Sequence, residues 1–200
     1  VNKGDTKTPD IRSRLVGREI RRGKATNDLF AATPPLESFR YILSVCASSQ
    51  ESRNPRERYV IMSNDIKRAY FYAAATRPIF VEIPPEDKDE DDQGMVAQLN
   101  LSLYGTRDAA MNWADTYTRL LVSIGFEVGK GSPCNFKHVE RGISLTVHGD
   151  DFTSTGTEAQ LRWLDTRLRE AYETKTKFLG PDAARGHEQA VRILNRVIQW

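Results

Sequence analysis

Long apolar runs are missing from this sequence of 200 residues, and cysteine is scarce. No apolar stretch approaches the ~20 residues that a membrane-spanning helix requires, so we expect no membrane partner. The first ten residues, VNKGDTKTPD, lack the apolar segment of a secretory signal peptide. The two cysteines, Cys46 and Cys134, are far apart and form no CxxC pair. These absences exclude a disulfide framework and indicate reduced thiols in an intracellular protein.

A strong excess of either charge is missing as well. The 29 Lys and Arg residues against 27 Asp and Glu give a net charge of +2, which is too small to indicate a nucleic-acid partner by itself. The distribution is more informative, because residues 1–24 are mainly basic whereas residues 86–92, EDKDEDD, are nearly all acidic. A basic arm can neutralise phosphates, and it can equally be a solvated segment without a partner.

An initiator methionine is also absent, since the sequence begins with Val1, and it stops at Trp200 within a pattern of helical spacing. Both features suggest a piece of a longer polypeptide. The hydrophobic share of 39% and the charged share of 28% are ordinary for a globular protein, and this length suffices to bury a hydrophobic core.

Apolar residues at helical spacing predict four helices. Thr33 and Thr157 are candidate N-caps of the first and third helix, the latter in a capping-box pattern with Gln160, and Gly125 ends the second. The fourth helix occupies the tail at 187–200. The apolar faces of the four helices consist of Phe39, Ile42, Leu43 and Cys46; Trp113, Tyr117, Leu120, Leu121 and Ile124; Leu161, Leu164, Leu168 and Tyr172; and Val191, Leu194 and Ile198.

Short apolar runs between these helices predict strands, because Pro, Gly and Asp bound them. The runs cover residues 59–62, 78–87 and 95–105, and consecutive strands within 134–155 turn at Arg141-Gly142 and again at Gly149-Asp150. Helices and mostly antiparallel strands in this order predict an α+β fold, with a sheet that is covered by helices on one face.

Three aspartates stand at the ends of two of these strands. Asp65 follows the apolar run at 59–62, and Asp150 and Asp151 lie at the tip of ISLTVHGDDFTST. The simplest interpretation of the tip is a hairpin turn, because Gly and Asp are typical turn residues. If the two strands are neighbours in one sheet, the three carboxylates meet at one edge, and their repulsion then indicates a bound cation. Carboxylates suit Mg²⁺ or Mn²⁺, and two such ions promote phosphoryl-type displacements.

Several segments in this order resemble a known family. The reverse transcriptase domain of copia-type LTR retrotransposons is similar to this chain, in register over roughly residues 13–180, in these segments: RSRLVGREI, PPLESFRYIL, NDIKRAYFYAAATRPIFVEIPP, LNLSLYGTRDAAMNWADTYTRLLVSIGF, CNFKH, LTVHGDDF and YETKTKFLG. The most specific parts are the block at Asp65, the SLYG block with Trp113, and the Asp150-Asp151 turn. Each part alone is a weak signal, and the ordered set is a strong one.

The resemblance implies the fingers and palm of a right-hand polymerase that copies an RNA or DNA template into DNA. It divides the chain into a fingers-like basic arm and helix at 1–58, a palm with the metal site at 59–180, and the start of a C-terminal helical extension at 181–200. The parent chain would be a Pol polyprotein that also carries RNase H and integrase. The implied location is intracellular, in a cytoplasmic particle or in the nucleus.

The resemblance also assigns roles to individual residues. The catalytic residues and ligands of two Mg²⁺ or Mn²⁺ ions would be Asp65, Asp150 and Asp151. The deoxynucleoside triphosphate would contact Arg12, Arg14, Arg68, Ala69, Tyr70 and Arg107, and the primer or template would contact Gly105, His148 and Gly149.

Some of these assignments have a plainer alternative in the sequence itself. Tyr70 would lie beneath the sugar and exclude ribonucleotides, or else it is a core aromatic beside Phe71. Arg12 and Arg14 would grip the triphosphate, or else they lie on a solvated strand edge. Trp113, in the SLYG block, is better explained as a core residue than as a stacking platform for bases.

Two departures from the family pattern bear on catalysis. His148 stands where the family commonly has Tyr, and its ring is smaller and can titrate. Asp108-Ala109-Ala110 stands where Gln-Ala-Pro is usual, and an acid beside a triphosphate is electrostatically unhelpful. An alternative hypothesis is therefore a decayed or truncated element that folds, and at most binds nucleic acid, without catalysis. A third is a soluble α+β domain of unrelated function, which requires Asp65 to lie far from the Asp150-Asp151 turn.

Overall fold

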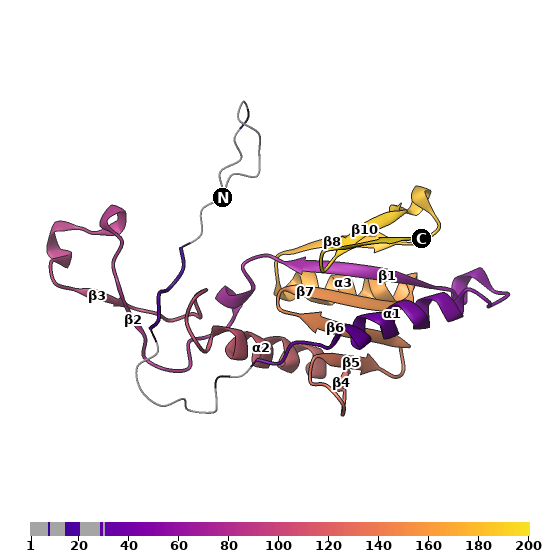
Figure 1. Cartoon of the computed structure of the whole chain (residues 1–200), viewed down its shortest axis with the longest axis horizontal. Coiled ribbons are helices and arrows are strands. Elements are labelled where there is room, and N and C mark those ends of the chain that lie inside the picture. Colours follow the sequence, from indigo (N-terminus) through magenta and orange to yellow (C-terminus); the bar gives the residue numbers. More distant parts are fainter. Residues whose placement is uncertain (1–7, 9–14, 21–28, 30) are drawn as a thin grey trace.

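One large sheet forms the centre of the molecule, shown by a computed structural model in Figure 1. The structure describes Thr8, Leu29 and residues 15–20 and 31–200. The strands of the sheet follow the order β4-β5-β6-β7-β1-β8-β9, and all neighbours are antiparallel except β8 and β9. Their bounds are β1 Tyr59–Ile66, β4 Glu127–Val128, β5 Asn135–His138, β6 Ile143–His148, β7 Asp151–Thr157, β8 Thr174–Leu179 and β9 His187–Glu188. The prediction of an α+β fold is thus confirmed.

Helices cover both faces of this sheet. Helix α1 (Leu36–Ser49) packs on β1, β6 and β7, whereas α2 (Ala109–Ser123) and α3 (Glu158–Ala171) share the core on the opposite face. Figure 1 shows α1 in front of the sheet and α3 behind it. The expectation that helices cover a single face is therefore wrong. None of the helices among the described residues is long and apolar enough to cross a membrane.

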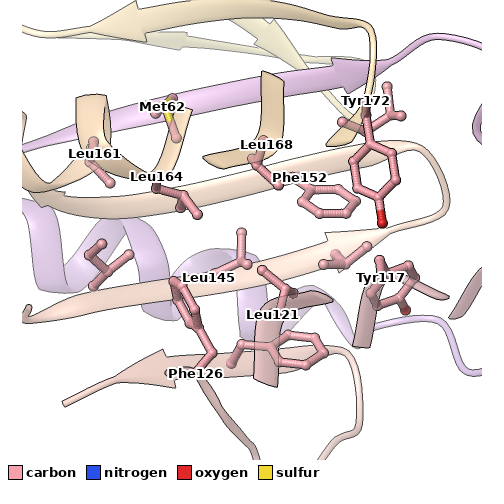
Figure 2. Packing of buried hydrophobic residues seen from close by; sticks show 14 of the residues in the cluster. Met62, Tyr117, Leu121, Phe126, Leu145, Phe152, Leu161, Leu164, Leu168 and Tyr172 are labelled. Carbon is pink, nitrogen blue, oxygen red and sulfur yellow. The ribbon is translucent and has the colours of Figure 1, made fainter. Parts of the chain in front are cut away.

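The larger core lies between the sheet and the α2–α3 layer (Figure 2). Side chains alternate along β1, so that Met62 and Ile66 enter this core while Ile61 enters a smaller core with α1. The apolar stripes predicted for α2 and α3 contribute Trp113, Tyr117, Leu121, Leu161, Leu164 and Leu168, all of which are buried. Burial of these large side chains supplies the main stabilising free energy of the domain.

Helix boundaries differ in detail from the sequence predictions. Helix α1 begins at Leu36 after Pro35 rather than after Thr33. Thr157 precedes α3 as expected, but its side chain makes no capping hydrogen bond, and Gln160 accepts one from Arg141 instead. The capping box is therefore absent although the helix start is right.

The tail at 181–200 contains strands and no helix, so the predicted C-terminal helix is wrong. A 3₁₀ turn (Ala183–Arg185) and β9 precede a hairpin of β10 (Ala190–Ile193) and β11 (Arg196–Gln199). Val191 and Ile193 are buried with the period of a strand, and the turn residues Leu194 and Asn195 have φ of 47° and 62°. Positive φ at both central residues is the mark of a type I′ hairpin turn, which splits the helical spacing seen in the sequence.

A separate two-stranded sheet projects from the main body at the far left of Figure 1. It pairs β2 (Phe80–Glu82) with β3 (Val96–Gln98), so only short parts of the two predicted runs are strands. Between them the acidic stretch forms the 3₁₀ turns Pro85–Asp87 and Glu90–Asp92, and every residue of 86–91 is exposed. This projecting hairpin keeps its acidic charge away from the main sheet.

Candidate active site

The three aspartates lie at one end of two adjacent strands. Asp65 in β1 is directly opposite Asp151 in β7, and Asp150 is the residue just before β7. The backbone N–H of Ile66 donates to the carbonyl oxygen of Asp150 at 3.0 Å, which joins the end of β1 to the turn. Partners in an antiparallel ladder are separated by only about 4.5–5.5 Å between Cα atoms. The expectation that these strands are neighbours is therefore confirmed, and an arrangement with Asp65 far from the turn is excluded.

Gly149 and Asp150 form the two-residue turn between β6 and β7. His148 and Asp151 are the last paired residues on either side, so the predicted hairpin is confirmed. Gly149 has φ of 65°, whereas Asp150 is not among the residues with positive φ. A type II′ turn has this pattern, with Gly at its first central position. The carbonyl oxygen of Gly149 accepts a hydrogen bond of 2.8 Å from the indole Nε1 of Trp113 in α2.

The pKa of Asp151 reflects its electrostatic interaction with the other two carboxylates. Burial first, and then the negative charges of Asp150 and Asp65, together raise the pKa of Asp151 to about 6, while His148 acts in the opposite direction. Mutual repulsion of this kind is relieved by a cation. In the part of the chain that the structure describes, no group of three or more His, Cys, Asp and Glu side chains is arranged to hold a metal ion. The fit of these residues to a cation therefore rests on their register and on their mutual repulsion.

A pocket of about 350 Å³ opens beside Asp151, on the face of the sheet that carries α1. Asp151 and Thr153 reach it because the intervening Phe152 points into the opposite core. The Nδ1 atom of His148 is buried and has no hydrogen-bond partner among the described residues. The pocket is lined by Pro34, Pro35, Leu36, Phe39, Thr146, His148, Asp151, Thr153, Leu194, Asn195 and Arg196.

The chain turns sharply after β1. Arg68 adopts a left-handed conformation, with φ of 56° and ψ of 38°, and the 3₁₀ turn Ala69–Tyr72 follows. The guanidinium of Arg68 pairs with Glu173 at 2.7 Å, so its side chain is engaged at the start of β8, while Ala69 is fully buried. Tyr70 packs on Tyr104 with ring centroids 4.4 Å apart. The pKa of Tyr70 is raised, first by burial and then by the negative charge of Asp150. Its hydroxyl therefore lies near Asp150.

Residues 15–20 dock against the loop that precedes α2. The N–H of Gly17 donates to the carbonyl of Tyr104 at 2.6 Å, and the N–H of Arg107 donates to Glu19 at 2.8 Å. Gly105, with φ of 90°, has no room for a Cβ because the carbonyl oxygen of Gly17 occupies that space. The close approach of the two backbones therefore explains why position 105 requires glycine. Arg12 and Arg14 lie outside the described residues.

Asp108 takes part in a buried ion pair. Its side chain is only 1% exposed, and Arg77 donates to both of its oxygens, from Nε at 3.1 Å and from Nη2 at 3.2 Å. The same Nη2 donates to Glu19 at 2.6 Å, and these bonds raise the pKa of Arg77. The acid that stands where the family usually has Gln is therefore paired with Arg77, a cation that it shares with Glu19.

Two features of the site were missed at the level of sequence. The spacing of apolar residues predicted a helix for the pocket residues 194–196, whereas Leu194 and Asn195 form the turn between β10 and β11. Nothing in the local pattern indicated that Trp113 donates to Gly149, because the two residues lie on different elements.

Comparison with known proteins identifies the family. The site places Asp65 and Asp151 opposite each other, next to Asp150, at one edge of an α+β sheet. A family model described as reverse transcriptase (RNA-dependent DNA polymerase) matches residues 2–183, and the chain belongs to this family.

Two relatives from Saccharomyces cerevisiae are transposon proteins. The Transposon Ty1-GR1 Gag-Pol polyprotein is 31% identical over 123 residues, which are 61% of this chain and 7% of that protein. The Truncated transposon Ty1-A Gag-Pol polyprotein shows the same identity over the same share of this chain, and 10% of its own length is covered. The resemblance to a copia-type reverse transcriptase domain is thereby confirmed, and the chain spans a small part of the polyproteins that it matches.

Proposed function

We propose that this chain transfers deoxynucleotides onto a primer under the direction of an RNA or DNA template. The primer 3′-hydroxyl would attack the α-phosphate of a deoxynucleoside triphosphate and release pyrophosphate. The observation that carries the proposal is the pairing of Asp65 with Asp151 beside Asp150, where burial and the charges of the other two aspartates raise the pKa of Asp151. Membership of the reverse transcriptase family supports it independently.

Asp65, Asp150 and Asp151 are proposed to hold two Mg²⁺ or Mn²⁺ ions. Bound ions of this kind stabilise the attacking and leaving oxygens of a phosphoryl displacement. With a pKa of about 6, Asp151 is mainly ionised at neutral pH and can then serve as a ligand. At lower pH it is protonated, which opposes metal binding.

The turn after β1 is the proposed cradle of the triphosphate. Its left-handed residue, Arg68, is followed by the tight turn at Ala69, and a left-handed residue in a turn can form a backbone concavity that favours anions. Tyr70, which lies near Asp150, would crowd the 2′-hydroxyl of a ribonucleotide. Arg107, together with Arg12 and Arg14 from the undescribed arm, would add positive charge.

His148, Gly149 and Gly105 are the proposed contacts of the primer and template. His148 lines the pocket, and Gly149 is part of the turn that carries Asp150. Gly105 belongs to the loop against which residues 15–20 pack. Arg196 adds an exposed cation to the same pocket, and such a cation suits a phosphate. Fingers and palm, divided near residue 58, remain our proposed description of these parts, and RNase H and integrase are proposed neighbours in a parent polyprotein.

Primer extension by the purified chain tests this function. We expect extension with Mg²⁺ or Mn²⁺, and we expect Asp150→Asn to abolish it without loss of folding. Asp115→Asn, on the exposed side of α2, is the matched control and should leave extension unchanged. Extension by the Asp150→Asn variant at the wild-type rate would refute the assignment. A folded wild type that binds primer–template in a salt-dependent manner but never extends it would instead favour a non-catalytic element.

A further inference from the structure

Two hydrogen bonds hold the two peptide groups of the turn that carries the aspartate pair. The indole N–H of Trp113 donates to the carbonyl of Gly149 at 2.8 Å, from the α2 side. The backbone N–H of Ile66 donates to the carbonyl of Asp150 at 3.0 Å, from the β1 side. The second bond lies just beyond the last registered pair of β1 and β7, whereas the first depends on a single side chain from a helix 36 residues earlier in the chain.

The bond from Trp113 acts on the one peptide whose orientation distinguishes two turn types. Types I′ and II′ differ by a rotation of the peptide between their central residues, which are Gly149 and Asp150 here. Type I′ places φ > 0 at both residues, and Asp tolerates that conformation. The structure has φ > 0 at Gly149 only. Since the carbonyl of Gly149 is one end of that peptide, its hydrogen bond selects the orientation in which Asp150 keeps negative φ.

The indole is itself held rigidly. Trp113 is 1% exposed, and its ring is 5.0 Å from that of Tyr172 and 5.5 Å from that of Tyr117, both edge to face. The ring of Phe152, the residue after Asp151, lies 6.3 Å away. Surrounded in this way, the indole cannot rotate to another acceptor, so its N–H is a fixed donor aimed at the turn.

We propose that Trp113 is a positioning residue for catalysis: its indole N–H fixes the Gly149–Asp150 peptide, and thereby the direction of the Asp150 carboxylate. The inference rests on the proposed function, because Asp150 is a metal ligand only there. Trp113 touches neither metal nor substrate in this account. Without its N–H the turn exchanges between two peptide orientations, and only one of them presents Asp150 for metal binding.

The substitution Trp113→Phe tests the proposal, because it keeps an aromatic ring and removes the donor. Trp163→Phe is the matched control, since Trp163 lies on α3 against Arg141 and His138, near the opposite end of β6. For the full 200-residue chain, urea unfolding, Mn²⁺ affinity by calorimetry, and single-nucleotide extension are measured side by side.

We expect Trp113→Phe to lower kcat and Mn²⁺ affinity about tenfold each, with the KM for the nucleotide changed less than about twofold. Trp163→Phe should change neither kcat nor Mn²⁺ affinity. A folded Trp113→Phe variant with kcat and Mn²⁺ affinity equal to wild type would overturn the proposal. A purely structural role would lower the urea midpoint of both variants and leave the Mn²⁺ affinity of their folded forms unchanged, which also overturns it.

A measurement on the wild type covers the case in which Trp113→Phe does not fold. The indole ¹H–¹⁵N resonance of Trp113 should shift on addition of Mg²⁺, while that of Trp163 should not, and Asp150→Asn should remove the shift. An unresponsive Trp113 resonance in a chain that binds Mg²⁺ contradicts the coupling. If the wild type fails to extend primers, the proposed function fails, yet Mn²⁺ affinity and this resonance still decide whether Trp113 positions Asp150.

Discussion

Replacing Asp151 with Asn should stabilise the metal-free chain near neutral pH. Burial and the charges of Asp150 and Asp65 raise the pKa of Asp151 from 3.8 to about 6. Between these values the folded state binds the proton more tightly than the unfolded state does. The stability that the neutral carboxyl contributes is therefore present at low pH and is lost as the pH rises through about 4 to 6.

The size of the effect follows from the shift. About two pKa units correspond to roughly 3 kcal/mol, at about 1.36 kcal/mol per unit. Because Asp151 is only half-buried, solvent screening reduces this figure, and we expect Asp151→Asn to gain about 1–2 kcal/mol at pH 7.5. Near pH 4 most of the gain should be absent, since the carboxyl of the folded wild type is then already neutral.

Urea unfolding with a chelator, at both pH values, measures the gain. The matched control is Asp115→Asn, which changes an exposed aspartate of α2 and should leave the free energy of unfolding nearly unchanged. Added Mg²⁺ should shrink the advantage of Asp151→Asn at pH 7.5, because the ion stabilises only the chain whose ligand is intact. An Asp151→Asn variant that is no more stable than wild type at pH 7.5, or equally stabilised at both pH values, would refute the reasoning.

Two further predictions concern the loop before α2. Asp108→Ala should lower the free energy of unfolding by about 2 kcal/mol, because Arg77 loses its buried partner; a urea-measured loss below about 0.5 kcal/mol, as at exposed sites, would contradict this. Gly105→Ala should release the N-terminal segment, since a Cβ there meets the carbonyl of Gly17. Gly94→Ala is the control, because Gly94 also has a positive φ but has open space around it. Both variants therefore carry backbone strain, and only Gly105→Ala should show faster tryptic cleavage of the N-terminal segment. Equal cleavage of the two variants would rule out the close approach as the cause.

Local pattern was sufficient for most of the elements. The stripes of α2 and α3 have helical spacing over three or more turns, and burial follows directly from such spacing. The hairpin at Gly149 was equally predictable, because a two-residue turn with Gly at its first position is defined by local chemistry. The tail was not, since the apolar residues of 187–200 fit a helix and a hairpin alike, and packing against α1 and β8 decided between them.

Three aspartates at strand ends, a turn between β6 and β7, and an ordered set of segments that resembles one family are all visible in the amino-acid sequence. Their contacts are visible only in the folded chain, which pairs Asp65 with Asp151 and Asp108 with Arg77, and directs the indole N–H of Trp113 to Gly149. Each of these contacts joins residues far apart in the chain. Local propensity specifies the elements, whereas the burial of their apolar faces specifies which of them meet.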